Sequence, residues 1–300
     1  MDPVMEPAER LMRVYAVPPL PPRPRDGHKG TFGRVLVVSG HPDMLGAPVL
    51  AGTAAYRSGC GYVQVATDRR LLPAALSVTP ELVGLSLDPA RDGSLVDAAG
   101  LADALVVGPG MGTLPASRRR LRRLLRLDRP AVLDADALNL LAAGPRDVPL
   151  PTTAVLTPHP GEMARLARWM QLPEGDAATP PARRRLALRA AERLGRVVVL
   201  KGAFTVVAAP PPTPRFYVEP SANTALSKAG TGDVLSGIIG SLLAQGMTAF
   251  DAAVLGVHVH ALAGAIARDR FGERSPLARD LIAAIPHALR RLEGSDPSRS

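Results

Sequence analysis

Short β-branched runs alternate with longer helical segments along most of this chain, and this alternation constrains the fold more than any other feature. Six runs bounded by Gly, Pro or Asp are predicted strands: 34–39, 62–66, 104–107, 131–134, 154–157 and 197–200. Seven segments are predicted helices: 48–58, 115–127, 161–171, 181–194, 234–245, 249–270 and 276–292. Because parallel strands need crossover helices, we predict an α/β fold with a mostly parallel sheet and helices on both faces.

The domain organisation follows from what interrupts this alternation. Residues 205–208 and 216–218 are predicted to pair as a small antiparallel hairpin around a stiff proline-rich connection. Residues 1–27 form a Pro/Arg-rich lead, with a short helix expected at 7–14. No domain-scale linker or internal repeat is visible. We therefore predict a single domain over 28–293, preceded by the lead and followed by a tail at 294–300.

The composition excludes several classes of protein. A hydrophobic content of 46% over 300 residues excludes a mainly disordered chain. The most apolar long stretch, 252–267, contains two histidines and is interpreted as a buried helix, so we expect no membrane partner. The N-terminus lacks an apolar signal core. A single cysteine, Cys60, excludes an internal disulfide and fits a reducing compartment, so we expect a cytoplasmic protein.

The net charge of +9 raises the possibility of nucleic-acid binding. The densest basic segment, 118–126, alternates arginines with leucines, so the leucines form one helical stripe and the arginines cover the rest. No aromatic residues interrupt it to offer a stacking platform. We therefore interpret the basic segments as solvated helix faces and expect no nucleic-acid partner.

Glycine and polar residues gather where the predicted strands end. These segments are 39–47, 108–112, 134–139, 157–162 and 201–203. Because open parallel sheets bind ligands beyond the carboxyl ends of their strands, these segments should converge on one crevice. Lys201 is one of only three lysines in the chain, and all three lie within two residues of a glycine, as is typical of phosphate sites.

Three glycines, a threonine and an aspartate stand at the start of an apolar helical segment, in the run AGTGDVLSG at 229–237. Glycine backbones approach ligands closely and helix N-termini carry partial positive charge, which predicts an anion site over Gly230, Thr231 and Gly232. A carboxylate there would repel phosphate unless it took a proton from an attacking hydroxyl, so Asp233 is a candidate base. The alternative is that Asp233 only caps the helix.

Four further residues are candidates at the strand ends. His159 stands between two prolines, which favours a ligand contact over a buried structural role. Asp134 is either a Mg²⁺ ligand, together with Asp136, or a structural acid at the end of its strand. Glu162 either caps the next helix or holds a metal-bound water. We keep Asp134 and Glu162 as candidate metal ligands.

The ordered set of motifs resembles a known family. The motifs are HKGTFG at 28–33, GAP at 46–48, GPGMG at 108–112, DADALN at 134–139, TPHPGE at 157–162, KGA at 201–203 and GTGD at 230–233. Together they resemble the bacterial ADP-dependent NAD(P)H-hydrate dehydratases, a branch of the ribokinase-like fold. Members are often fused to an N-terminal epimerase domain, for which this chain has no room, so it resembles the stand-alone dehydratase.

The resemblance implies repair of damaged nicotinamide cofactors: (6S)-NADHX or (6S)-NADPHX is converted to NADH or NADPH while ADP is split into AMP and phosphate. It implies that the hydrate contacts Ala47, Gly112, His159 and Asp233. It implies adenine-nucleotide contacts at Lys201, Gly202, Ala203, Phe204, Thr205 and Gly232. It also implies Mg²⁺ as the cofactor, a separate epimerase in the same pathway, and a homo-oligomer, expected to be a tetramer.

Two competing functions share some of these features. A kinase of the same fold acting on a hydroxymethylpyrimidine-like vitamin precursor would share the GTGD segment, although the His159 motif and the glycines at 108–112 argue against it. A non-catalytic nucleotide-binding protein would bind ADP without turnover, and the intact Asp233 argues against that.

Overall fold

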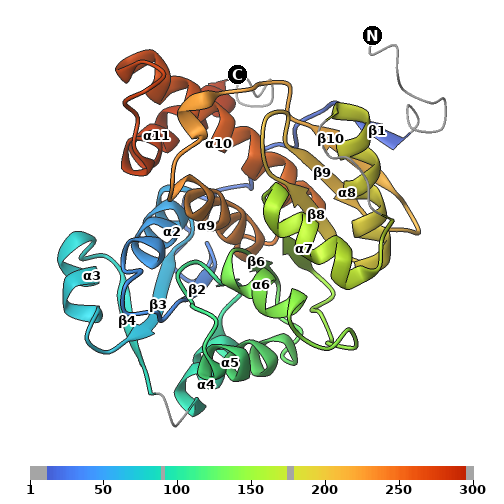
Figure 1. Ribbon diagram of the computed structural model, residues 1–300. Helices are drawn as coiled ribbons and strands as arrows, with labels where there is room; N and C mark the ends of the chain where they lie inside the picture. Colours follow the sequence, from blue (N-terminus) through green and yellow to red (C-terminus); the bar gives the residue numbers. More distant parts are fainter. Residues whose placement is uncertain (1–11, 89–91, 174–178, 295–300) are drawn as a thin grey trace.

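The computed structural model describes residues 12–88, 92–173 and 179–294, which form a central sheet between two layers of helices (Figure 1). The strands are β1 (Arg13–Val14), β2 (Arg34–Val38), β3 (Tyr62–Asp68), β4 (Val83–Leu87), β5 (Ala104–Val107), β6 (Ala131–Leu133), β7 (Ala154–Leu156), β8 (Val197–Leu200), β9 (Val206–Ala209) and β10 (Arg215–Val218). Their order across the sheet is β1-β10-β9-β8-β7-β6-β5-β2-β3-β4. β9 pairs antiparallel with both β8 and β10, and the remaining pairs are parallel.

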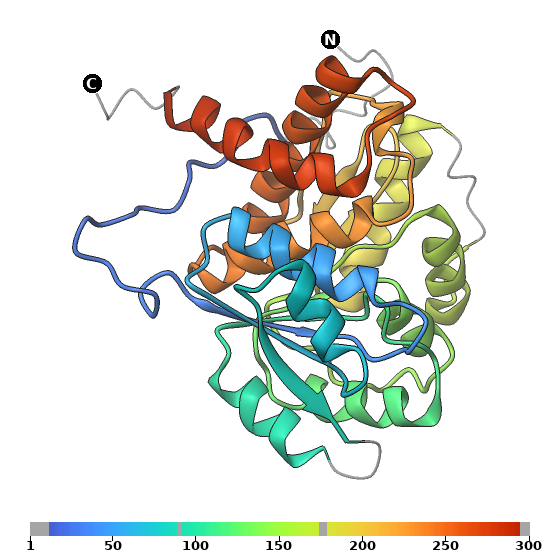
Figure 2. The ribbon, with the colours of Figure 1, turned by 90° about the vertical axis from the view of Figure 1, so that its left-hand side faces the viewer.

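The helices cover both faces of the sheet, as the alternation predicts (Figures 1 and 2). One layer consists of α2 (Gly46–Arg57), α9 (Thr231–Ala244), α10 (Ala249–Phe271) and α11 (Ala278–Gly294). The other consists of α4 (Gly93–Leu101), α5 (Pro115–Leu125), α6 (Asp136–Ala142), α7 (Pro160–Met170) and α8 (Pro180–Leu194). α3 (Leu72–Val78) packs beside β4, and a 3-10 turn, η1 (Thr224–Leu226), precedes α9.

Alternation of side chains along each buried strand creates the two cores. In β2, Val35 and Val37 pack with α2 and α9, whereas Leu36 and Val38 pack with the helices on the opposite face. All four are at most 1% exposed. A parallel strand buried on both faces is a continuous apolar run, which is why the sequence pattern located these strands.

The structure also corrects and extends the predicted elements. The helix expected at 7–14 is wrong at its C-terminal end, because Arg13–Val14 is a strand that pairs parallel with β10, and residues 7–11 lie outside the described residues. The predictions did not include β4, α3, α4 or α6. These elements are short, and the strand β4 is exposed or half-buried over four of its five residues, so it lacks the pattern of a doubly covered strand.

The chain reverses direction across the sheet at β2. From β2 it builds outward through β3 and β4, then returns to β5 and builds the other way through β6, β7 and β8. Beyond the carboxyl ends of β2 and β5 the two loops interlock, because the Ser39 hydroxyl and the His41 N–H both donate to the Gly110 carbonyl at 2.9 Å. Such a switch point is the usual ligand crevice of open α/β sheets.

The helices α2 and α9 are in close backbone contact. A Cβ atom added at Gly237 would lie 2.1 Å from the carbonyl oxygen of Ala51, and one added at Gly240 would lie 2.4 Å from Val106 on the sheet. Only glycine therefore allows α9 to pack this closely on α2 and β5. The contact fixes α9, whose first turn carries the GTGD segment.

The helix α10 has the length and mean hydropathy of a membrane span, as an 18-residue window within Ala249–Phe271 has a mean hydropathy of 1.5. That window is 61% buried inside the structure, between α9 and α11 and against the sheet. This placement agrees with the prediction of a buried helix in this segment.

Candidate active site

Three elements bring a buried carboxylate, an ammonium and a hydroxyl together beyond the sheet. Asp134 follows β6 and is 1% exposed. Its Oδ1 accepts a 2.6 Å hydrogen bond from Nζ of Lys201, which follows β8, and its Oδ2 accepts another of 2.6 Å from the Ser236 hydroxyl on α9. Burial works against the charge of Lys201, but Asp134 and then Glu162 raise the pKa of its amine overall. Lys201 therefore stays protonated.

Glu162 and His159 form a reciprocal cap at the start of α7. The Nδ1 atom of His159 accepts from the N–H groups of Gly161 and Glu162, and Oε2 of Glu162 accepts from the His159 N–H at 2.7 Å. Burial, with help from Lys201 and Arg165, lowers the pKa of His159. The ring is thus neutral near pH 7, as an accepting Nδ1 requires. Of the two readings of Glu162, capping is therefore realised in the structure.

Asp233 is the third residue of α9 and does not occupy its N-cap. The N-cap is Gly230, whose φ of 89° is left-handed, and no side chain caps this helix. Within the described residues, the Asp233 carboxylate accepts no hydrogen bond. Burial, and next the neighbouring Asp134 carboxylate, raise the pKa of Asp233 to about 7. A half-buried carboxylate that titrates near neutrality suits a general base better than a helix cap.

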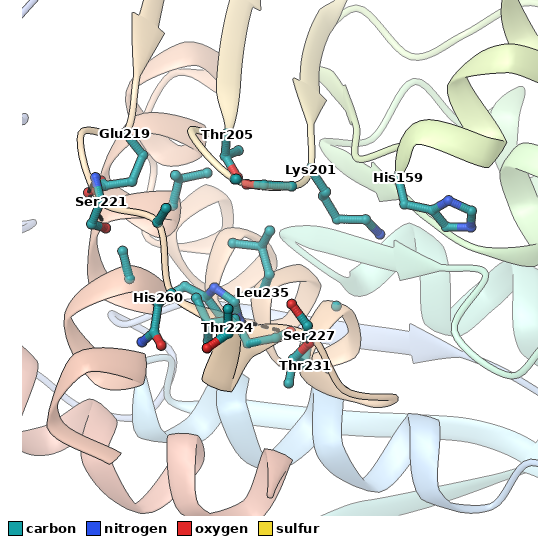
Figure 3. A pocket seen from close by; sticks show the side chains of 18 of the residues that line it. His159, Lys201, Thr205, Glu219, Ser221, Thr224, Ser227, Thr231, Leu235 and His260 are labelled. Atoms are coloured by element: carbon teal, nitrogen blue, oxygen red, sulfur yellow. Dashed lines mark hydrogen bonds between the residues drawn. The ribbon is translucent and has the colours of Figure 1, made fainter. Parts of the chain in front are cut away.

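A cavity of about 410 Å³ opens beside this cluster, between the ends of β8 and β10 and the helices α9 and α10 (Figure 3). Of the predicted nucleotide contacts, five line it: Lys201, Gly202, Ala203, Thr205 and Gly232. His159 and Thr231 also line it. The Lys201 side chain extends along the cavity toward His159 (Figure 3). The structure thus brings most of the predicted nucleotide residues to one cavity.

Phe204 is the predicted nucleotide contact that the cavity does not include. Phe204 is 42% exposed as a residue and lines a separate hollow with Pro180 and Arg183. The backbone at Phe204 is left-handed, with φ 55°, in the turn that carries the chain from Lys201 into β9. That turn directs the ring away from the cavity, so any contact with a nucleotide at this position would involve the backbone.

Several cavity residues were missed by the sequence reasoning. They come from the segment after β10 and from α10: Glu219, Ser221, Asn223, Thr224, Ser227 and His260. Glu219 is 4% exposed and accepts from the Tyr217 and Ser221 hydroxyls at 2.9 Å. Burial opposes its charge, but His258 and these hydroxyls lower its pKa overall, so it remains ionised. The polar composition of 219–228, directly before GTGD, was the available signal.

The two remaining predicted hydrate contacts, Ala47 and Gly112, lie at the switch point of the sheet and not in the 410 Å³ cavity. The Gly112 N–H donates to Oδ2 of Asp136 at 2.8 Å, and its φ of 71° is one that glycine adopts without strain. A Cβ here would lie 2.7 Å from the His41 ring. Asp136 therefore positions the glycine loop in this structure.

Gly232 lies between the 410 Å³ cavity and the switch point of the sheet. A Cβ added there would lie 3.3 Å from Nζ of Lys201 and 3.9 Å from Oδ2 of Asp134. The first turn of α9 thus passes directly beside the Lys201–Asp134 pair. A ligand group at this turn would meet backbone N–H groups, an ammonium and the Asp233 carboxylate.

These features define a class of protein. The sheet with helices on both faces is that of a ribokinase-like α/β protein, because a ribokinase-like superfamily protein from Enterococcus faecalis superposes with a TM-score of 0.78 at 26% identity, covering 91% of this chain and 92% of that one. This agrees with the predicted fold class. A family model described as NAD(P)H-hydrate dehydratase matches residues 35–287. The chain therefore belongs to the NAD(P)H-hydrate dehydratase family.

Individual relatives agree with this assignment. The ADP-dependent (S)-NAD(P)H-hydrate dehydratase of Neisseria meningitidis serogroup B is 41% identical over 89% of this chain and 88% of its own length. The ADP/ATP-dependent NAD(P)H-hydrate dehydratase of Bacillus subtilis, co-crystallised with ATP/Mg²⁺, superposes with a TM-score of 0.77 at 31% identity, covering 91% of this chain and 95% of that one. The bifunctional NAD(P)H-hydrate repair enzyme of Moorella thermoacetica is 40% identical over 91% of this chain. The chain spans about half of that relative's length, 52%.

Proposed function

We propose that this chain catalyses the ADP-dependent dehydration of (6S)-NADHX and (6S)-NADPHX to NADH and NADPH, releasing AMP and phosphate. The observation that carries the proposal is the pairing of Asp233, whose pKa is about 7, with a nucleotide-sized cavity lined by Lys201 and Gly232. Relatives named as dehydratases support this activity over a vitamin-precursor kinase.

The chemistry explains why a kinase-like fold serves a dehydratase. Hydroxide is a poor leaving group, so direct loss of water from C6 of the hydrate is slow. Transfer of the terminal phosphoryl group of ADP to the C6 oxygen breaks the bond to AMP and makes a good leaving group. The ring nitrogen lone pair then expels phosphate from C6, and loss of a proton from C5 restores the dihydropyridine.

Each half of the site has a role in this scheme. Asp233 takes the proton of the C6 hydroxyl as its oxygen attacks phosphorus. The backbone N–H groups of Gly230, Thr231 and Gly232 stabilise the transferred phosphoryl group as an anion hole, together with the positive end of α9. Lys201 contacts the nucleotide phosphates, and Ala47, Gly112 and His159 hold the hydrate against Asp233.

Mg²⁺ fits the site as an ion that arrives with the nucleotide, not as the centre of a protein cage. Within the described residues, no group of three or more His, Cys, Asp or Glu side chains could hold a metal. Both oxygens of Asp134 already accept hydrogen bonds. However, the carboxylates of Asp134, Glu162 and Asp233 outnumber the single ammonium of Lys201, which favours a cation bound mainly by phosphate oxygens. Asp134 and Glu162 would hold it, and it would neutralise charge on the transferred group.

The cellular setting of the proposal follows from the same resemblance. We propose a cytoplasmic homotetramer of single-domain subunits that works alongside a separate NAD(P)HX epimerase. The bifunctional names of the longer relatives support a link with a second repair activity.

The proposal is tested by mixing purified protein with hydrated NADH and following NADH absorbance. Absorbance should rise with ADP and Mg²⁺ and stay flat without nucleotide, and ATP in place of ADP establishes which donor is used. ADP binding without any NADH formation would identify a non-catalytic nucleotide-binding protein and contradict the proposal.

A further inference from the structure

A shallow hollow of about 510 Å³ lies along the outer face of α5. Besides Thr113, it is lined mainly by arginines: Arg118, Arg119, Arg122, Arg123 and Arg126. The nucleotide site does not include this hollow, and the function proposed above does not use it. It begins at Thr113, the residue that follows Gly112.

The charges of this face are unfavourable for the helix that carries them. Arg118 and Arg122, and likewise Arg122 and Arg126, are like-charged pairs spaced four residues apart, which destabilise a helix. The first turn of α5 contains no acidic residue to complement the positive end of the helix. A local arrangement that works against stability in this way is typical of a functional surface.

The Asp92 carboxylate forms ion pairs with two arginines of this cluster, Arg119 and Arg123. Asp92, 1% exposed as a side chain, pairs with Arg119 at 2.9 Å and with Arg123 at 3.6 Å, and it also pairs with the buried Arg120 at 3.0 Å. In the described parts of the chain, Arg118, Arg122 and Arg126 take part in no ion pair. Their charge therefore faces the hollow uncompensated.

The topology places the start of this face at the edge of the crevice. α5 connects the parallel strands β5 and β6, so its first turn lies at their carboxyl ends and its last turn lies at the opposite edge. From Pro115 to Arg126 the helix rises about 16 Å. A ligand that enters at Gly112 and extends along α5 meets Arg118 first and Arg122 one turn further on.

We propose that this arginine hollow binds the 2′-phosphate at the adenosine end of (6S)-NADPHX and gives the chain a preference for NADPHX over NADHX. The inference rests on the proposed function, because it takes the hydrate as the ligand at Gly112. The two hydrates differ only by this phosphate. Arginine binds phosphate through paired, charge-assisted hydrogen bonds, so the hollow can distinguish NADPHX from NADHX. The reacting ring, which is the same in both hydrates, offers no such distinction.

The test compares both hydrates in the wild-type chain and in the charge-reversal variants Arg118→Glu and Arg122→Glu. The ratio of kcat/KM for NADPHX to that for NADHX should fall by roughly tenfold or more in each, which is the size of a lost charge-assisted contact. Arg189→Glu, at an exposed arginine of α8, is the matched control and should leave this ratio unchanged. Arg122→Gln should give a smaller fall in the same direction if the reversed charge prevents folding.

A second measurement does not depend on turnover. With the nucleotide cavity saturated by ADP, calorimetry should show adenosine 2′,5′-bisphosphate binding more tightly than AMP, and Arg122→Glu should remove the difference. An unchanged ratio in a working enzyme, or an equal fall in Arg189→Glu, would overturn the inference while leaving the proposed function intact. If the wild-type chain turns over neither hydrate, the proposed function fails, and the calorimetry still decides whether the hollow binds a 2′-phosphate.

Discussion

At the scale of single residues, the main feature is the balance of charge around Lys201. The carboxylates of Asp134, Glu162 and Asp233 all act on one ammonium group. The Oδ1 atom of Asp134 lies 2.6 Å from Nζ of Lys201. After burial, the Asp134 carboxylate is also the largest cause of the raised pKa of Asp233. The same buried carboxylate therefore holds Lys201 in place and keeps Asp233 basic enough to accept a proton near neutral pH.

Asp233→Asn should fold, bind ADP at least as well, and lose turnover by roughly 10² or more, because it removes the proton acceptor without changing shape.

In the wild-type chain kcat/KM should fall as pH drops below about 7, where Asp233 becomes protonated. The free energy of unfolding should change in the opposite direction, rising as pH falls. The pKa of this carboxyl is about 7 in the folded chain and 3.8 in the unfolded chain, so the folded chain loses stability as pH rises from 4 to 7 and the buried carboxyl is forced to ionise.

The Asn variant should therefore melt a few degrees higher than the wild type at pH 8, with the gap closing toward pH 4. Melting curves across this range check the stability effect, and a coupled NADH assay checks the rate. Near-normal NADH formation in Asp233→Asn would place the catalytic base elsewhere.

The Lys201–Asp134 pair should behave as one unit. Lys201→Met should weaken ADP binding by roughly ten- to a hundredfold, because a charge-assisted phosphate contact is lost. It also leaves Asp134 buried without its partner, which costs about 3–5 kcal/mol in comparable pairs. Combining it with Asp134→Asn should cost clearly less free energy of unfolding than the sum of the single changes. Additive losses in denaturant titrations would show that the two side chains are not coupled.

At the scale of elements, the start of α7 shows how a site residue can also be a structural one. His159→Ala removes the acceptor for two N–H groups and should lower the stability of the chain by about 1 kcal/mol. His159→Asn keeps an acceptor that caps helices well and should recover most of that loss. Both variants should raise KM for the hydrate and leave ADP binding nearly unchanged. Thermal melts and KM measurements on the pair separate the two roles, and a normal KM in both would remove His159 from the substrate site.

The elements that could be predicted from sequence are those whose burial leaves a periodic pattern. β5 and β8 are apolar along their whole length, and β2 is apolar after Arg34, because helices cover both faces of these strands. The helix α5 shows its leucine stripe plainly. The edge strand β4 and the small helix α6 are too short or too exposed to leave such a pattern. The predicted elements end within a few residues of the observed ones.

The candidate site was predictable where a ligand needs glycine or a fixed backbone. Lys201, Gly232 and Asp233 stand in short segments that combine glycine with a charged residue, which is a pattern typical of phosphate sites. Glu219 and His260 line the same cavity but come from a polar loop and from the middle of an apolar helix. Their proximity depends on how α10 packs against the sheet, and no local pattern records that packing. Burial lowers the pKa of His260 to about 4, and its Nε2 lies 2.9 Å from the Thr231 carbonyl, which is also a tertiary effect.

At the scale of the whole molecule, the lead segment is more closely attached than its composition suggests. β1 extends the sheet beyond β10, Val14, Val17 and Leu20 pack against the core, and Arg23 donates to the Gly59 carbonyl at 2.8 Å. Between β1 and β2 the chain runs as a long loop at the side of the fold (dark blue in Figure 2).

Deleting residues 1–27 should therefore lower Tm by roughly 5 °C or more, as partly buried apolar side chains are each worth about 1 kcal/mol or more. The catalytic turnover should change little, because none of the described residues of the lead, 12–27, lines the cavity. A chain lacking only residues 1–11 is the control that isolates the contribution of 12–27. An unchanged Tm in the longer deletion would confirm the lead as an independent appendage.

The contact of Gly237 with Ala51 has a consequence for the order of events during synthesis. The two residues come from opposite ends of the chain, and the first turn of α9 reaches its place only when α9 packs on α2. Contacts this distant in sequence form late and slowly. While α9 is still inside the ribosome, the emerged part of the chain can form β2 to β8. It lacks the anion hole and Asp233, which both belong to the start of α9. Nucleotide binding should thus appear only after α9 has left the ribosome and packed on α2, and the growing chain stays inert toward ADP until then.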